Sequence, residues 1–265
     1  MPTTPAPAEF LPADGTAPIA LVTGGARRIG AAFVHALAAR GFAVAIHCNS
    51  SRDQAEALEE CIAAAGHARP VVVQADLADP AAPAALLGQL PGPARLLVNN
   101  ASLFANDRFG AIDPALWQQH MAVNLLAPVL LTQAFAAALP TGANGLVVNL
   151  SDAKLSSPNP DFFSYTISKM GLAGATDLAA RALAPRIRVN AIAPAVTLVS
   201  GPQSRDNFEQ AHVMNALGRG VDVADLVRAL LYLVETPTVT GQTLTVDGGQ
   251  RFLALPRDVA YMVPE

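Results

Sequence analysis

The chain has 265 residues, of which 52% are hydrophobic and 14% are charged, and its formal net charge is −4. This length and apolar content favour one domain with a large core. The absence of any cluster of Lys or Arg argues against nucleic acid and against a charged membrane surface as partners.

Residues 1–17 are rich in Pro, Ala and Thr, and they predict a disordered N-terminal extension that differs from a signal peptide. Residues 18–265 are expected to form the domain. No run reaches the roughly 18 uninterrupted apolar residues of a membrane helix. Cys48 and Cys61 are the only cysteines, which fits a reducing compartment. We therefore expect a soluble, cytoplasmic protein.

From residue 19 onward, short apolar runs alternate with segments rich in Ala and Leu. The predicted strands are 19–23, 43–47, 71–74, 96–99, 146–150, 188–192 and 243–246. The predicted helices lie near 29–40, 53–65, 80–90, 114–138, 164–183 and 223–234. This alternation predicts a single α/β domain with a Rossmann-type, doubly wound parallel sheet of about seven strands and helices on both faces. Polar and turn residues at 195–210 predict a mobile loop near a site. In such sheets, ligands bind beyond the carboxyl ends of the strands.

The turn after the first predicted strand is rich in glycine and leads directly into a helix. Glycines let the backbone approach a pyrophosphate, and the free N–H groups of the helix N-terminus stabilise the negative charge. The spacing differs from GxGxxG, so an ordinary strand–helix turn is an alternative. The cofactor-binding candidates in this turn are Gly24, Arg27, Arg28, Ile29 and Gly30.

The end of the second predicted strand distinguishes the two nicotinamide cofactors. An NAD site usually places an acid there, whereas this segment has none before Asp53. Arg27, Arg28 and Arg52 can hold a 2′-phosphate through charge-assisted hydrogen bonds, which favours NADPH over NADH. Arg52 can equally be a solvated surface residue. The other cofactor-binding candidates here are His47, Asn49, Ser50 and Ser51.

Two further strand ends supply candidates for cofactor binding. Asp76, next to Leu77, can accept from the adenine amino group or can simply cap the next helix. Small and amide-bearing residues follow the fourth strand, where the backbone must pass close to a nicotinamide ribose, although an Asn-Asn turn is also common. These residues are Asn100, Ala101 and Ser102.

Tyr165 and Lys169 are four residues apart in a predicted helix and therefore share one face. The Lys ammonium is expected to lower the pKa of the phenol and so to make the hydroxyl a usable proton donor. Asp152 follows the fifth strand, so its carboxyl can meet the Tyr hydroxyl in the crevice. Asn124 lies in an apolar helix, where it can hold a water beside Lys169 or simply bond a neighbouring carbonyl.

These motifs stand in order along the chain: TGGARRIG at 23–30, NNAS at 99–102, Asn124, Tyr165-x-x-x-Lys169 and Val246-Asp247-Gly248-Gly249. Over roughly residues 18–250 the set resembles the short-chain dehydrogenase/reductase family. The resemblance implies that Tyr165 is the proton donor, that Lys169 activates it and contacts the ribose, and that Asn124 holds a water. It also implies a homotetramer, which fits the large apolar faces of 114–138 and 164–183. Further cofactor-binding residues that it implies are Pro194, Val196 and Thr197.

Three departures resemble the pteridine reductase branch of that family. Asp152 stands where an active-site Ser is usual, with Ser151 one residue out of place; Arg28 replaces a glycine; and NNAS ends in Ser102. Phe104 matches the aromatic residue that stacks the pterin against the nicotinamide. The resemblance implies NADPH-dependent hydride transfer to a C=N bond of a dihydropteridine, namely dihydromonapterin, dihydrobiopterin or dihydrofolate. The expected substrate contacts are Arg28, Phe104, Asp152 and Tyr165.

Two other functions remain open from the sequence. One is an NADPH-dependent reductase of another carbonyl compound, such as a ketoacyl substrate. The other is a non-catalytic NADPH sensor, against which the intact set of Asn124, Tyr165 and Lys169 argues. A metal enzyme is not expected, because the five histidines show no ligand spacing.

Overall fold

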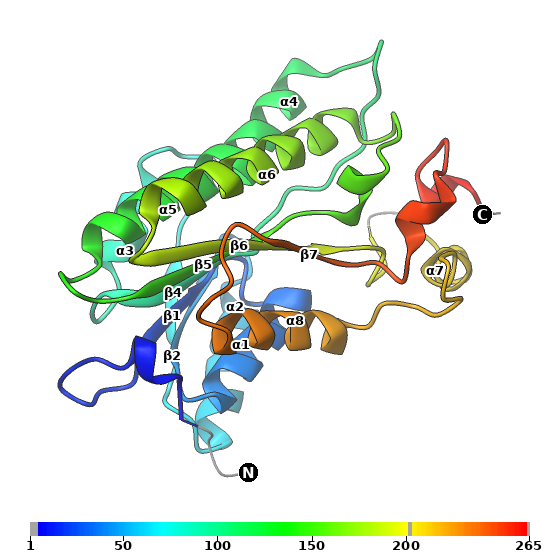
Figure 1. Ribbon diagram of the computed structural model, residues 1–265. Coiled ribbons are helices and arrows are strands. Elements are labelled where there is room, and N and C mark those ends of the chain that lie inside the picture. Colours follow the sequence, from blue (N-terminus) through cyan, green and yellow to red (C-terminus); the bar gives the residue numbers. More distant parts are fainter. Residues whose placement is uncertain (1–4, 201–202, 264–265) are drawn as a thin grey trace.

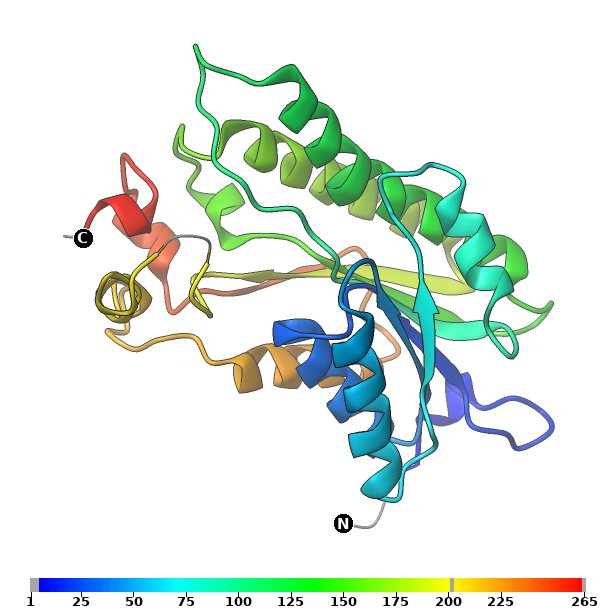
Figure 2. The same cartoon turned by 180° about the vertical axis from the view of Figure 1, so that it is seen from behind.

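The computed structural model describes residues 5–200 and 203–263 (Figures 1 and 2). Seven parallel strands form one sheet in the order β3-β2-β1-β4-β5-β6-β7. The predicted doubly wound sheet is therefore confirmed. The chain order reverses between β1 and β4, which places the ligand crevice at the carboxyl ends of these strands. The strands are β1 (Ile19–Val22), β2 (Ala43–Cys48), β3 (Val71–Gln74), β4 (Ala94–Asn99), β5 (Gly145–Leu150), β6 (Ile187–Pro194) and β7 (Thr243–Val246).

Helices cover both faces of the sheet (Figure 1). One layer contains α1 (Arg28–Ala39), α2 (Arg52–Ala64) and α8 (Val223–Glu235). The other contains α3 (Ala82–Gly88), α4 (Pro114–Met121), the π-helical turn Ala122–Leu126, α5 (Ala127–Ala138) and α6 (Phe163–Leu183). The four 3-10 turns are Ala8–Phe10, Ala153–Ser156, Gln250–Leu253 and Val259–Tyr261.

The apolar strands are explained by this double cover. Every residue of β5 is buried, because its side chains enter two cores, one on each face of the sheet. Phe33 and Leu230 belong to the core beneath α1 and α8, whereas Leu131 and Phe135 belong to the core beneath α5. The two cores hold the strand ends rigidly, and the candidate site lies at those ends.

Part of the N-terminal segment packs on the domain, so the predicted disordered extension is corrected at residues 6–10, while residues 1–4 lie outside the described part. Phe10 is fully buried and packs against Phe42, with 5.7 Å between ring centroids. Glu9 pairs with the guanidinium of Arg188 at 2.9 Å. The Phe10 side chain alone buries a large apolar surface, which the Pro- and Ala-rich composition of the segment does not indicate.

The predicted loop at 195–210 is helical in its second half. Helix α7 (Arg205–His212) begins after Ser204, whose hydroxyl accepts from the N–H of Asn207 at 3.2 Å. Phe208 stacks on His212 with 4.8 Å between ring centroids. The prediction is therefore corrected from residue 205 onward, while residues 201–202 lie outside the described part.

One described stretch, Pro114–Ala138, is long and apolar enough by length and composition to cross a membrane, although it holds no uninterrupted apolar run of that length. In this fold it is part of the outer helical layer. Its second half, α5, contacts β4 and β5, and α4 contacts α6. On the other side of this layer, Leu126 and Val129 are partly exposed.

Candidate active site

A cavity of about 770 Å³ lies beyond the carboxyl ends of β1 to β6. It is lined by the predicted cofactor-binding residues with the exception of Lys169 and Arg52, and by all four predicted substrate contacts. Asn124, predicted to be catalytic, does not line it either. The residues of six strand ends thus meet at one edge of the sheet, as the topology requires.

The first turn brings the backbone unusually close to the cavity. A Cβ atom on Gly30 would lie 2.2 Å from the carbonyl oxygen of Gly24, so only glycine fits there. The side-chain amide of Asn100 donates to the carbonyls of Thr23 (2.8 Å) and Gly24 (3.1 Å), which ties the turn to the end of β4. This fixed turn at the N-terminus of α1 forms a cradle that suits a pyrophosphate.

His47 supports the same turn from behind. Its Nδ1 accepts from the backbone N–H of Gly24, and its Nε2 donates to the carbonyl of Ala75, both at 3.1 Å. This pair of bonds requires the neutral ring. Burial lowers the pKa of His47, in agreement with a neutral imidazole. His47 therefore fixes the position of Gly24 at the edge of the cavity.

The three arginines that were predicted to hold a 2′-phosphate differ in their surroundings. Arg52 bonds Glu56 at 2.7 Å and Gln74 at 3.4 Å, and it does not line the cavity. Arg28 has a φ of 55°, in the region that favours glycine, and it donates to the carbonyl of Val199 at 2.8 Å. Arg27 is exposed and lines the cavity, and its guanidinium has no hydrogen bond to the described residues. Of the three, Arg27 is therefore the one whose guanidinium faces the cavity without a hydrogen-bond partner among the described residues.

Asp76 was predicted either to accept from the adenine amino group or to cap the next helix, and it has a capping geometry. Its Oδ1 accepts from the N–H of Ala78 at 3.0 Å and from the side chain of Asn49 at 3.4 Å. The other oxygen faces no hydrogen-bond donor within the described residues, and Asp76 lines the cavity. The carboxylate can therefore cap the turn and still accept from a ligand.

Asp152 and Tyr165 face the same compartment. The Tyr165 hydroxyl donates to Oδ2 of Asp152 at 2.7 Å, and the backbone N–H of Lys154 donates to its Oδ1 at 2.8 Å. The Nζ of Lys169 lies 5.7 Å from the Tyr165 ring centroid and donates to the carbonyl of Leu150 at 2.7 Å. A phenol, an ammonium and a carboxyl converge at this edge of the cavity.

Burial dominates the protonation of this group. Burial, followed by the charge of Asp152, raises the pKa of Tyr165 well above 10.0, so the expectation of a lowered phenol pKa is wrong for this arrangement. Burial also raises the pKa of Asp152 and lowers the pKa of Lys169 to about 8. The Tyr hydroxyl therefore keeps its proton and is suited to donate it.

Asn124 is fully buried in the π-helical turn and uses its side chain within the protein. Its Oδ1 accepts from the N–H of Leu103 at 2.8 Å, and its Nδ2 donates to the carbonyl of Leu103 at 2.9 Å and to Ser168 at 3.1 Å. This is the geometry of the second interpretation, a buried amide that bonds its neighbours. Asn124 fixes the loop that carries Phe104.

Phe104 lines the cavity and remains 43% exposed. One side of its ring stacks on Phe162, at 4.3 Å between centroids and 18° between planes, and the Tyr165 ring meets it edge-on at 4.7 Å. Such fixed aromatic surfaces bind planar rings well.

Several lining residues escaped the sequence analysis. Ser151 was set aside as out of place, yet its buried hydroxyl has no partner among the described residues and it lines the cavity. Its position directly after β5 was a usable signal. Lys154 and Phe162 carried no motif. Further lining residues come from the distant C-terminal segment, among them Leu255, Asp258, Val259 and Ala260.

A doubly wound sheet with a Tyr–Lys pair beside a glycine-bearing turn defines a nucleotide-dependent oxidoreductase. The family model for short chain dehydrogenase matches residues 18–210, and the chain belongs to this family.

Proteins similar to this chain include an oxoacyl reductase and two dihydrofolate reductases. The chain is 31% identical over 238 residues to a 3-oxoacyl-[acyl-carrier-protein] reductase of Staphylococcus aureus, which covers 87% of this chain and 96% of the relative. It is 47% identical to the solved FolM alternative dihydrofolate reductase 1 of Brucella canis in complex with NADP, with a TM-score of 0.86 and coverage of 93% and 97%. The corresponding protein of Brucella suis, also solved with NADP, is 48% identical over 89% of this chain and 95% of that one, with a TM-score of 0.84.

Proposed function

We propose that this protein is an NADPH-dependent reductase that transfers a hydride to a C=N bond of a dihydropteridine, either dihydrofolate or a smaller dihydropterin such as dihydromonapterin or dihydrobiopterin. The observation that carries the proposal is the hydrogen bond from Tyr165 to Asp152 at 2.7 Å inside the cavity. Its support is the carboxyl at a position where the family usually has Ser, and the likeness to two dihydrofolate reductases.

The chemistry suits a carboxyl better than a serine. The 2-amino-4-oxo ring of a pteridine presents N–H donors, which a carboxylate accepts better than a hydroxyl does. The planar ring fits against the open side of Phe104. When bound, a reduced nicotinamide would supply the hydride for the carbon of the C=N bond. Tyr165 would give its proton to the nitrogen, the Lys169 ammonium would stabilise the resulting phenolate, and solvent would return a proton to the phenolate. Asp152 accepts hydrogen bonds throughout and so orients Tyr165 and the ring.

The residues around the cavity fit the proposed cofactor. Gly24 and Gly30 leave room for a pyrophosphate at the start of α1, and Asn49, Ser50 and Ser51 line the region near Arg27 where a 2′-phosphate belongs. Pro194, Val196 and Thr197 also line the cavity, and we assign them to contacts with the nicotinamide.

Arg27→Gln is expected to raise the KM for NADPH about tenfold or more and to leave the KM for NADH unchanged, because a charged hydrogen bond to phosphate is lost. Steady-state kinetics with both cofactors measures this. The matched control is Arg52→Gln, whose side chain bonds Glu56 outside the cavity and should change neither value. A larger effect of Arg52→Gln than of Arg27→Gln would reverse the assignment.

The main competing function is reduction of another carbonyl compound, which the names of the oxoacyl relatives favour. NADPH oxidation is measured with dihydrofolate, dihydromonapterin, dihydrobiopterin and a ketoacyl thioester. We expect turnover of at least one pteridine with a kcat/KM well above that of the thioester. No turnover of any pteridine would disprove the proposal.

We also infer a cytoplasmic homotetramer. The two cysteines are free, which fits a reducing compartment. Leu126, Val129 and Leu178 on the α5–α6 layer are exposed, and an apolar hollow lies between these helices. Light scattering of the purified protein is expected to give four times the chain mass, and a monomer mass would contradict this inference.

A further inference from the structure

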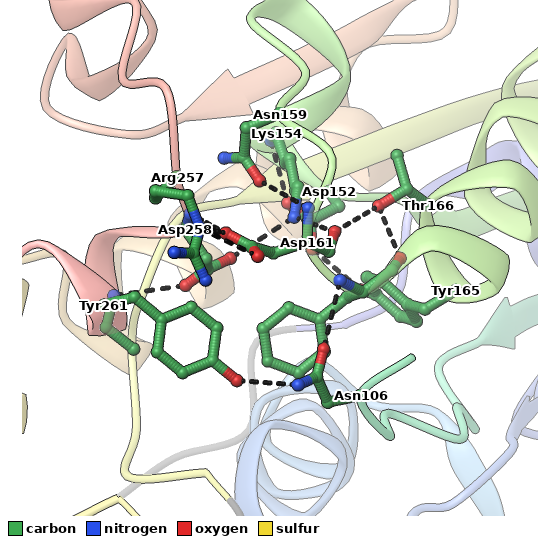
Figure 3. Close-up of polar contacts among 12 residues, drawn as sticks. Asn106, Asp152, Lys154, Asn159, Asp161, Tyr165, Thr166, Arg257, Asp258 and Tyr261 are labelled. Atoms are coloured by element: carbon green, nitrogen blue, oxygen red, sulfur yellow. Dashed lines mark hydrogen bonds and ion pairs between the residues drawn. The ribbon is translucent and has the colours of Figure 1, made fainter. Parts of the chain in front are cut away.

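Arg257, Asp258 and Tyr261 of the C-terminal segment lie beside Asp152 and Asp161 (Figure 3), and residues of this segment form part of the wall of the cavity. Leu255, Asp258, Val259 and Ala260 all line it, next to Asp152 and Tyr165. Helix α6 and the strand-end residues therefore provide only part of the pocket.

A buried carboxylate holds this segment at Arg257. Asp161 is 7% exposed, and its Oδ2 accepts from the Nε of Arg257 at 2.8 Å and from the backbone N–H of Asp258 at 2.7 Å. Charge-assisted bonds to a nearly buried carboxylate are stronger than those of surface pairs. The main chain at Asp258 is thereby fixed beside the site.

A second anchor, Tyr261, lies four residues after Arg257. The Tyr261 ring stacks on Phe162, with 6.0 Å between centroids and 13° between planes. The side chain of Asn106 donates to the Tyr261 hydroxyl at 2.9 Å. Phe162 is also the ring on which Phe104 stacks, so the segment is joined to the proposed ring-binding surface.

The Asp258 carboxylate lies between these two anchors. Its Oδ2 is 3.4 Å from the Nζ of Lys154, and its Oδ1 accepts from the N–H of Ala260 at 3.1 Å. Lys154 also donates to the backbone carbonyl of Asp161 at 2.5 Å, so it links Asp161 to the Asp258 carboxylate. Asp258 acts electrostatically on both Asp152 and Tyr165, since its charge raises the pKa of each after the larger contribution of burial.

We propose that Asp258 is a specificity-determining residue, which with Asp152 forms a pair of hydrogen-bond acceptors that selects a ring edge rich in N–H donors. This inference rests on the proposed function and extends it to the outer wall of the site. The two carboxylates disfavour binding of a ketone, because its carbonyl oxygen can only accept hydrogen bonds. The Lys154 ammonium pairs with Asp258 at 3.4 Å without occupying all of the lone pairs of its carboxylate.

The test compares Asp258→Asn with the parent full-length protein on a dihydropteridine and on a small β-ketoester. We expect the KM for the dihydropteridine to rise about tenfold, because a hydrogen bond to a charged acceptor is lost. Its kcat, the KM for NADPH and the kcat/KM for the ketoester should change less than about threefold. An unchanged pteridine KM, or equal changes for both substrates, would overturn the role of Asp258.

Hydrogen exchange of residues 255–263 separates direct selection from release of the segment. Asp258→Asn should keep the protection of the parent, whereas Arg257→Gln should lose it because the bond to Asp161 is removed. Loss of protection in Asp258→Asn would overturn direct selection. The matched control is Arg205→Gln, which breaks an exposed pair with Glu209 on α7. A parent inactive on every pteridine would disprove the proposed function and this inference together, whereas an active parent with an insensitive Asp258→Asn would disprove this inference alone.

Discussion

Tyr165→Phe is expected to lower kcat for pteridine reduction about a thousandfold, within the range for removal of a positioned proton donor. The ring stays 4.7 Å from Phe104, so the surface against which the substrate packs is retained. The KM values for NADPH and for the pteridine should therefore change little. Steady-state kinetics with a thermal unfolding control measures both effects.

The matched control is Tyr232→Phe. Tyr232 lies on α8 and is 49% exposed, far in the chain from the cavity residues. It should leave kcat and KM unchanged. If Tyr165→Phe retained more than about a tenth of the parent kcat, the hydroxyl would not be the proton donor.

Lys169→Met is expected to lower kcat about a hundredfold while making the fold more stable. The lysine is 2% exposed, and burial depresses its pKa from 10.5 to about 8. This depression corresponds to roughly 3 kcal/mol of cost to the charged form. Methionine removes that cost but leaves the carbonyl of Leu150 without its donor, which costs about 1–3 kcal/mol. We expect a net gain of about 1 kcal/mol in the free energy of unfolding, measured by urea denaturation.

The pH dependence of this gain has a definite sign. Below about pH 8 the lysine is protonated in both the folded and the unfolded chain, so the parent bears the full cost. Between about 8 and 10.5 only the unfolded chain holds the proton, and the stability of the parent rises toward that of the variant. The advantage of Lys169→Met should therefore shrink as the pH rises through this window. A difference that grows with pH would contradict the assigned pKa.

The value of kcat should also depend on whether Lys169 is protonated. Loss of the ammonium above about pH 8 removes the charge that stabilises the Tyr165 phenolate, so kcat should fall there. Lys169→Arg serves as the matched variant, because a guanidinium stays charged throughout this range. Its kcat is expected to be lower than that of the parent but nearly independent of pH from 7 to 9.

The strands and the site edge could be predicted from the sequence because the determining signals are local. Each strand is a short, largely apolar segment of 4 to 8 residues, and the observed bounds of β3 and β7 match the predicted ranges. The residues directly after these runs gather at one edge of a parallel sheet whatever the details of packing. This rule explains why nearly all of the predicted cofactor contacts line a single cavity.

The parts that escaped prediction depend on contacts between distant residues. Asp161 and Arg257 are separated by 96 positions, and neither belongs to a recognisable motif. The helical spacing of Tyr165 and Lys169 indicates a shared face, but it says nothing of how deeply both are buried. Burial and the third partner, Asp152, reverse the expected direction of the phenol pKa. Likewise, only the fold shows that Phe10 reaches Phe42.

The most direct test of the account is a single-turnover reaction with NADPH that carries deuterium at the reactive nicotinamide carbon, with dihydropteridine as substrate. Mass spectrometry of the product should show one added deuterium for the parent, and almost no product for Tyr165→Phe in the same time. Unlabelled product, or no pteridine reduction by a protein that reduces the ketoacyl thioester, would contradict it.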